Sequence, residues 1–298
     1  MPAECARSPT MSSALKNAAE KAIGGGMAGA LAMVVQVLAL MWMRTTINFQ
    51  HSKGMTTIAA MQALYAEGGI SRFYRGVWAA LLQAPISRFG DTGANAGMLA
   101  LLEGAQWMSP WTKTLCASAA AAFFRIFITP IDTLKTTLQV QGSEGMAVLS
   151  ERIAADGILT LYSGAIATSV ATFVGHYPWF VTYNFLQSRI PRATASPGKQ
   201  IRSACIGLAA SFNSDVISNS VRVVKTAKQT NPAAISYLAT ISMIVAQDGG
   251  LYGLFFRGLS TKLLSNGLQA MLFTICWRYF EELIAAYTAR TRTRPHAA

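Results

Sequence analysis

The sequence has few charged residues for its length. Of its 298 residues, 13% are Asp, Glu, Lys or Arg, whereas 52% are hydrophobic. An average soluble domain has about 25% charged residues, and the mean hydropathy of +0.34 departs from that average in the same direction. The composition therefore favours a membrane protein over a soluble domain.

Acidic residues are scarcer still, and the formal net charge is +12. The basic residues are scattered between apolar runs and form no patch with interleaved aromatic residues. Because such a patch is the usual sign of nucleic-acid binding, we expect no nucleic-acid partner. A basic membrane protein beside anionic lipid is the simpler interpretation.

The motifs of enzymes and metal sites are also missing. The four cysteines lie far apart, and Cys116, Cys205 and Cys276 fall in apolar segments, where buried, reduced thiols are expected. The GxGxxG at 24–29 has no strand before it and no acid about 20 residues on, so close helix packing is the better explanation. We expect no catalytic residue, no metal and no cofactor.

Long and short apolar segments alternate in a regular order, which is long, short, long, three times over. The segment 22–43 is uncharged and long enough for one membrane span, which needs about 20 residues. The other long segments start near 76, 109, 164, 201 and 263, and the short amphipathic ones cover 55–66, 142–155 and 232–247.

Polar residues recur with the same period. Arg44, Lys135 and Lys225 are 91 and 90 residues apart, and an amide follows each by four residues. Acid-glycine pairs and later glycines repeat in phase: Glu67-Gly68, Asp156-Gly157 and Asp248-Gly249, then Gly76, Gly164 and Gly258. These agreements indicate a threefold internal repeat.

The second copy holds Pro130, Asp132 and Lys135 within an apolar helix. A proline bends a helix, and a charge pair in a membrane helix is costly enough to imply a function. This Pro-x-acid-x-x-base pattern, followed by acid-Gly and aromatic-base-Gly, resembles the mitochondrial carrier family over roughly residues 17–287. The second repeat has the first half of the pattern intact, and the first and third repeats have the second half.

The resemblance implies an all-α membrane protein with six transmembrane helices and three short amphipathic helices on the matrix side, in a pseudo-threefold bundle. The repeats would cover 17–105, 106–192 and 198–287, with disordered tails at 1–16 and 288–298. It further implies a monomeric secondary transporter that moves a small metabolite across the mitochondrial inner membrane by alternating access, in contact with lipid that includes cardiolipin. Peroxisomal and plastid relatives share the pattern, and a carrier-fold receptor or assembly factor without transport is the alternative.

In this family, an acid on one odd-numbered helix pairs with a base on the next and closes the matrix side. The acid positions here are Met41, Asp132 and Arg222, so the resemblance allows one pair, Asp132–Lys225. An excess of cations would attract anions to this end; alternatively, Arg222 reaches lipid headgroups and the gate closes by packing. The positions of this matrix gate are Arg44, Asp132, Lys135, Arg222, Lys225 and Gln139.

The positions of the cytosolic gate carry an unusual set of side chains, with Asn184, Gln187, Arg278 and Glu281 as its polar members. The substrate contact positions would be Gln83, Ala171, Thr172, Ser265 and Asn266. Arg125 and Asp215 occupy equivalent places on two helices, and Arg88 and Asp91 add a second base and acid. These charges favour a mixed-charge or zwitterionic substrate; the alternative is two internal ion pairs, Arg88–Asp91 and Arg125–Asp215.

Overall fold

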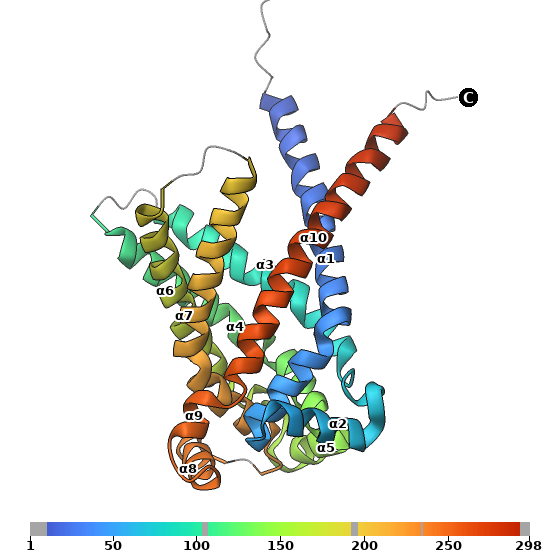
Figure 1. Ribbon diagram of the computed structural model, residues 1–298, viewed down its shortest axis with the longest axis vertical. Helices are drawn as coiled ribbons and strands as arrows, with labels where there is room; N and C mark the ends of the chain where they lie inside the picture. Colours follow the sequence, from blue (N-terminus) through green and yellow to red (C-terminus); the bar gives the residue numbers. More distant parts are fainter. Residues whose placement is uncertain (1–10, 103–106, 192–195, 234, 293–298) are drawn as a thin grey trace, which may run out of the picture. The chain divides into compact units, whose positions relative to one another are not determined.

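The computed structural model describes residues 11–102, 107–191, 196–233 and 235–292, and every regular element within these ranges is a helix (Figure 1). Within the two expected tails, residues 11–16 and 288–292 are helical. The rest of these tails, 1–10 and 293–298, lies outside the described residues. The elements are α1 (Met11–Lys53), α2 (Thr57–Arg72), α3 (Val77–Leu101), α4 (Pro110–Gln141), η1 (Gly142–Glu144), α5 (Gly145–Asp156), η2 (Ile158–Tyr162), α6 (Ala165–Arg189), α7 (Ser196–Thr230), α8 (Tyr237–Gln247), α9 (Tyr252–Phe256) and α10 (Leu259–Arg292).

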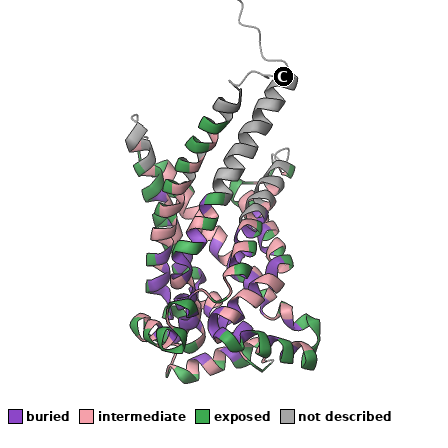
Figure 2. Cartoon of the chain, turned by 90° about the vertical axis from the view of Figure 1, so that its right-hand side faces the viewer, coloured by how far each residue is buried: buried purple, intermediate pink, exposed green. Residues whose placement is uncertain are grey.

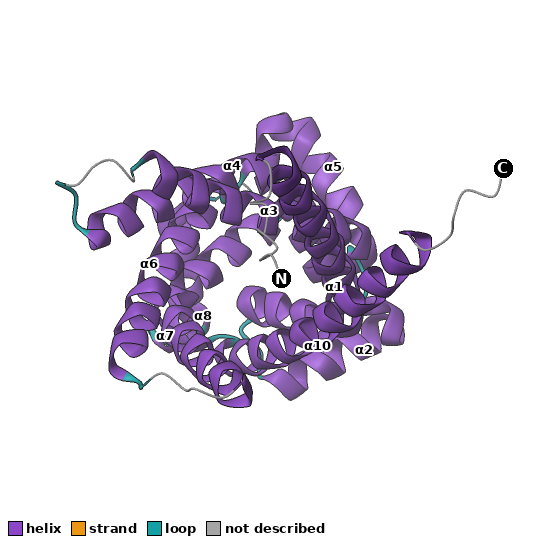
Figure 3. Cartoon of the chain, turned by 90° about the horizontal axis from the view of Figure 1, so that it is seen from above, coloured by secondary structure: helices purple, strands orange, loops and turns teal. Residues whose placement is uncertain are grey.

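The chain divides into two compact units. The terminal unit contains residues 1–36 and 269–298, and within it the Gln36 side chain donates to the carbonyl of Gln269 at 2.9 Å. The core unit contains residues 37–268, in which α6 lies beside α7 and α3 beside α4 (Figure 3). All polar clusters described below belong to the core unit.

Several helices are apolar enough to cross a membrane. Among the described residues, length and composition select the segments Leu31–Lys53, Pro110–Asp156 and Ile158–Arg189, with a fourth if α8 and Tyr252–Cys276, bent by 104°, are taken as one span. Exposed side chains alternate with buried ones along these helices (Figure 2), and the exposed ones include Phe123 and Phe127. An apolar outer face of this kind suits contact with lipid.

The short helices and cysteines depart in detail from the expectations. The expected 55–66 helix extends to Arg72 across non-helical Gly68 and Gly69, and the expected 232–247 helix begins later, at Tyr237. Ser236 caps that start by accepting a hydrogen bond from the backbone of Ala239. Of the three cysteines expected to be buried, Cys205 is exposed, and Cys116 and Cys276 are partly buried.

Three equivalent glycines join each repeat to the next. Gly76, Gly164 and Gly258 all have positive φ, at +80°, +87° and +64°. A Cβ on them would lie 3.1 Å from the backbone of Lys135 on α4, 2.8 Å from Gln229 on α7 and 3.0 Å from His51 on α1, respectively. The contacts run in the cyclic order from repeat 1 to 2, 2 to 3 and 3 to 1, which shows the threefold relation in the core unit.

Gly164→Ala should destabilise the protein more than Gly157→Ala. Both glycines have positive φ, but a Cβ at Gly157 would meet nothing within 4 Å, whereas at Gly164 it would press on buried Gln229. We expect backbone strain of about 1 kcal/mol in both variants and a further penalty of about 1–3 kcal/mol in Gly164→Ala. Melting temperatures of the purified variants test this, and equal values would contradict the close packing at Gly164.

Candidate functional site

The C-terminal ends of α1, α4 and α7 are tied together by side-chain hydrogen bonds. Asn48 on α1 donates to Gln139 on α4 at 2.6 Å, and Gln229 on α7 donates to Thr133 on α4 at 3.2 Å. The hydroxyls of Ser52 on α1 and Thr230 on α7 are 2.9 Å apart. Side-chain hydrogen bonds therefore connect all three pairs of helices at this end of the core unit.

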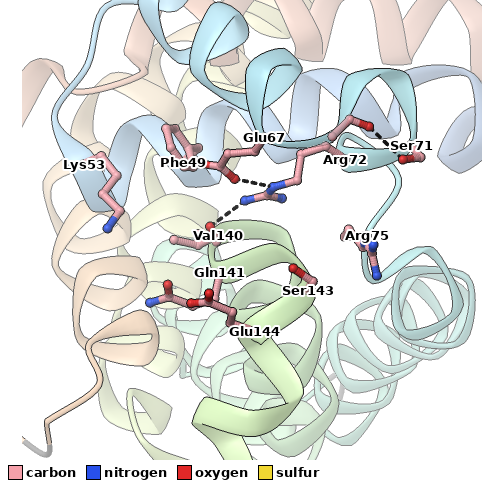
Figure 4. A pocket seen from close by; sticks show the side chains of 11 residues that line it. Phe49, Lys53, Glu67, Ser71, Arg72, Arg75, Val140, Gln141, Ser143 and Glu144 are labelled. Atoms are coloured by element: carbon pink, nitrogen blue, oxygen red, sulfur yellow. Dashed lines mark hydrogen bonds and ion pairs between the residues drawn. The ribbon is translucent and has the colours of Figure 1, made fainter.

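Three arginines reinforce the same end. Arg72 pairs with Glu67 at 2.6 Å and donates to the carbonyls of Gln139 and Val140 at 2.8 and 2.7 Å (Figure 4). Its counterparts are Arg152, which donates to the carbonyl of Gln229 at 2.8 Å, and Arg257, whose longer contact with the carbonyl of His51 is 3.4 Å. Arg72, Arg152 and Arg257 therefore bind carbonyls at the C-terminal ends of α4, α7 and α1, respectively.

The sequence did not point to this role for the arginines. Arg257 follows the acid of its acid-glycine pair, Asp248, and forms an ion pair with it at 2.7 Å, whereas Arg152 precedes Asp156 on α5. A search for a base near each acid-glycine pair, in either direction, would have found all three. Arg72 also borders a polar cavity of about 360 Å³, with Arg75 and Glu144 on its wall (Figure 4).

Asp132 is the centre of the buried polar network. Its side chain is 5% exposed, and it forms an ion pair with Lys225 of α7, the pair that the resemblance allows. Lys135, one turn on, also binds it, with Nζ 2.9 Å from Oδ1. Gln83 of α3 donates to the same oxygen at 3.1 Å and accepts from Lys135 at 2.9 Å. Lys135 therefore has an acidic partner on its own helix, while Met41 stands at the acid position of the first repeat.

Met41 stands where the resemblance puts the acid of the first repeat. It is fully buried, and its sulfur accepts a hydrogen bond from Gln139 at 3.5 Å. Gln139 thus contacts α1 twice, through Met41 and Asn48. The sequence predicts no ion pair between α1 and α4 at this position. Packing and neutral hydrogen bonds join the two helices there.

The other buried charges are paired differently from the expectation. Asp91 of α3 accepts from two nitrogens of Arg125 on α4, with the Nε distance at 3.0 Å. Asp215 of α7 pairs instead with Lys262 of α10 at 3.0 Å and accepts from Asn266. The Arg125–Asp215 pair, the alternative to a substrate site, is therefore not found among the described residues, and the side chain of Arg88 lies outside them. Each observed pair joins neighbouring helices.

Arg222 forms no ion pair among the described residues. Its Nε donates to Ser218 at 3.2 Å, and a terminal nitrogen would be 3.4 Å from a Cβ at Gly175 on α6. The Arg222 guanidinium therefore lies between α6 and α7 and does not point away from the bundle.

The remaining predicted positions differ in burial. Ala171, Thr172 and Ser265 are buried, and the Thr172 hydroxyl donates within its own helix to Thr168 at 2.9 Å. Arg44 is partly buried. Of the cytosolic positions, Asn184 is exposed and Gln187 accepts from Arg202 and donates to Tyr183 at 3.0 Å. The side chains of Arg278 and Glu281 lie outside the description.

A bundle of long apolar helices around buried ion pairs defines a polytopic membrane protein with a polar interior. A family model described as mitochondrial carrier protein matches residues 15–103 and 106–193, which is more than half of the chain. The chain therefore belongs to the mitochondrial carrier family, whose members are transporters rather than enzymes.

Curated relatives agree with this assignment at low identity. Peroxisomal adenine nucleotide transporter 1 of Saccharomyces cerevisiae is 29% identical, with 51% of this chain and 56% of that protein covered. Mitochondrial glycine transporter A of Danio rerio is 25% identical, with 59% and 61% covered. Protein MITOFERRINLIKE 1, chloroplastic, of Arabidopsis thaliana is 24% identical, with 63% and 47% covered. The matches span less than two thirds of each relative's length.

Asp132→Asn should destabilise the protein strongly. The change leaves Lys135 and Lys225 buried beside a neutral amide, and breaking a buried ion pair on one side costs about 3–5 kcal/mol. We expect a melting temperature several degrees below that of the wild type in detergent. Glu151→Gln, at an exposed position of α5, is the matched control and should melt with the wild type. Equal melting of Asp132→Asn and the control would refute the central role of Asp132.

Proposed function

We propose that the protein is a secondary transporter that carries a small metabolite through a central cavity by alternating access. The connected C-terminal ends of α1, α4 and α7 and the Asp132–Lys225 pair are the observations that support this. In this proposal, these helix ends and the ion pair form one of two gates, the one on the matrix side. The arrangement proposed is six spans and three matrix helices, in repeats covering 17–105, 106–192 and 198–287.

The substrate proposed is a small solute with an anionic group. The ion pairs of the described interior join three acids, Asp91, Asp132 and Asp215, to four bases, Arg125, Lys135, Lys225 and Lys262, and Arg222 adds a further positive charge. All three acids are paired, so the charge left for a ligand is positive and is concentrated at Arg222. An arginine in a polar interior is well suited to bind a carboxylate or phosphate group.

A mixed-charge or zwitterionic substrate fits the same interior. Its ammonium group would replace Lys262 at Asp215, while its anionic group binds Arg222; both residues are on α7, seven positions apart, or about two turns. Among the relatives, one name gives glycine, a zwitterion, and another gives adenine nucleotide, a polyanion. The predicted contact positions Gln83, Thr172, Ser265 and Asn266 would supply neutral hydrogen bonds.

The proposed location is the mitochondrial inner membrane, with the peroxisomal and plastid membranes as alternatives. The relatives' names include all three organelles. The proposal further includes a monomer in contact with anionic lipid such as cardiolipin, for which the net charge of +12 gives general electrostatic support.

A receptor or assembly factor without transport is the second candidate. The observation that favours it is the loss of charge from the gate, where Met41 and Arg222 stand at two of the three acid positions. Uptake assays with the full chain in liposomes separate the two functions. Amino acids, nucleotides and carboxylates should be screened, and uptake of a solute above that of empty liposomes supports transport. Uptake of none would favour the receptor.

Arg222→Gln should lower the uptake of anionic solutes by about tenfold, because a hydrogen bond to a charged group is lost. Arg189→Gln is the matched control, since Arg189 is exposed at the end of α6 and stacks on Phe185. Uptake at varied solute concentration by liposomes with equal amounts of each variant tests this. Wild-type uptake by Arg222→Gln would remove Arg222 from the proposed substrate site.

A further inference from the structure

Lys135 has no acid to bind on α1, because Met41 occupies the equivalent position and is fully buried. Within the core unit, the ammonium group instead contacts two oxygens at 2.9 Å, Oδ1 of Asp132 and Oε1 of Gln83. The first oxygen comes from its own helix and does not join repeats. Gln83, on α3, is therefore the contact that connects Lys135 to the first repeat.

The Gln83 amide is used at both ends by this network. Its oxygen accepts from Lys135, and its nitrogen donates to Asp132 at 3.1 Å, which leaves Oδ2 of Asp132 for Lys225. With 8% of its surface exposed, Gln83 makes these contacts out of bulk water. Hydrogen bonds to charged groups in such surroundings are stronger than those between neutral groups.

We infer that Gln83 replaces the missing carboxylate at position 41 and acts as a positioning residue that couples ligand binding to gate opening. A ligand that takes the Gln83 amide removes one oxygen from Lys135 and one donor from Asp132 in the same event. The gate then retains the Asp132–Lys225 pair but loses the hydrogen bonds by which Gln83 of α3 holds Asp132 and Lys135 of α4. The inference rests on the proposed function for its ligand, but the closure by Gln83 does not.

The coupling acts in both directions. Since the closed network and the ligand compete for one amide, closing the gate must weaken ligand binding by the factor by which the ligand favours opening. Carboxylate, hydroxyl and amide groups can all bind a glutamine side chain, so the switch responds to polar solutes in general. Selection by charge would then remain with Arg222.

A double-mutant cycle in the full chain tests the closure without any ligand. Gln83→Leu should lower the melting temperature in detergent by several degrees. Met41→Asp should restore most of that loss in the double variant, because a carboxylate at position 41 gives Lys135 a new partner on α1. Additive effects of the two changes would overturn the inference.

Gln50→Leu is the matched control for loss of a buried glutamine. Gln50 is 3% exposed, and its side chain donates to Met55 and Thr57, at 3.2 and 3.3 Å, instead of binding Lys135. Met41→Asp should not restore its stability. Equal rescue of Gln50→Leu would show that the aspartate stabilises the fold in general and would overturn the inference.

Exchange of a solute from the uptake screen, measured in liposomes, tests whether Gln83 couples ligand binding to gate opening. The double variant Met41→Asp/Gln83→Leu should close but lack the switch, and its exchange rate should fall at least about tenfold below the wild type. Wild-type exchange by this variant would overturn the coupling. If no solute is transported by the wild type, the proposed function fails, while a specific rescue in the melting cycle would still support closure by Gln83.

Discussion

The buried carboxylate of Asp132 is the interaction on which the rest of the core unit depends. A charge at this depth is stable only if its oxygens are paired, and Lys135, Lys225 and Gln83 supply the partners. The two lysines are in turn stable only because Asp132 is charged. One carboxylate thus compensates cations from two helices and holds an amide from a third.

The threefold repeat survives in packing where it has been lost in charge. Equivalent close contacts join Gly76 to α4, Gly164 to α7 and Gly258 to α1. The three arginines likewise bind backbone carbonyls at the C-terminal ends of these helices. Neutral hydrogen bonds, such as the one from Asn48 to Gln139, complete the closure. Because fewer charges are removed from water here than in an arrangement with three ion pairs, this end of the core unit carries a smaller desolvation penalty.

The sequence was informative about local motifs and less so about pairing. It predicted the helices and the Asp132–Lys225 contact, because a repeated motif fixes which residues share a position. The alternative of an Arg125–Asp215 ion pair is not observed, since equivalent positions on α4 and α7 do not make their side chains neighbours; Arg125 pairs with α3 and Asp215 with α10. Arg72, Arg152 and Arg257 were missed because each bonds to the next repeat from a different place in its own repeat.

The roles of Gln83 and Arg222 show how a lost charge is compensated. Position 41 carries Met in place of an acid, and the neutral amide of Gln83, on a different helix, binds Lys135 instead. At position 222 the acid became a base, and no described carboxylate pairs with it. The first loss is compensated within the protein, and the second leaves a positive charge facing the interior. A ligand that brings a negative group to Arg222 and a polar group to Gln83 would therefore complete the charge balance and open the gate through the same two positions.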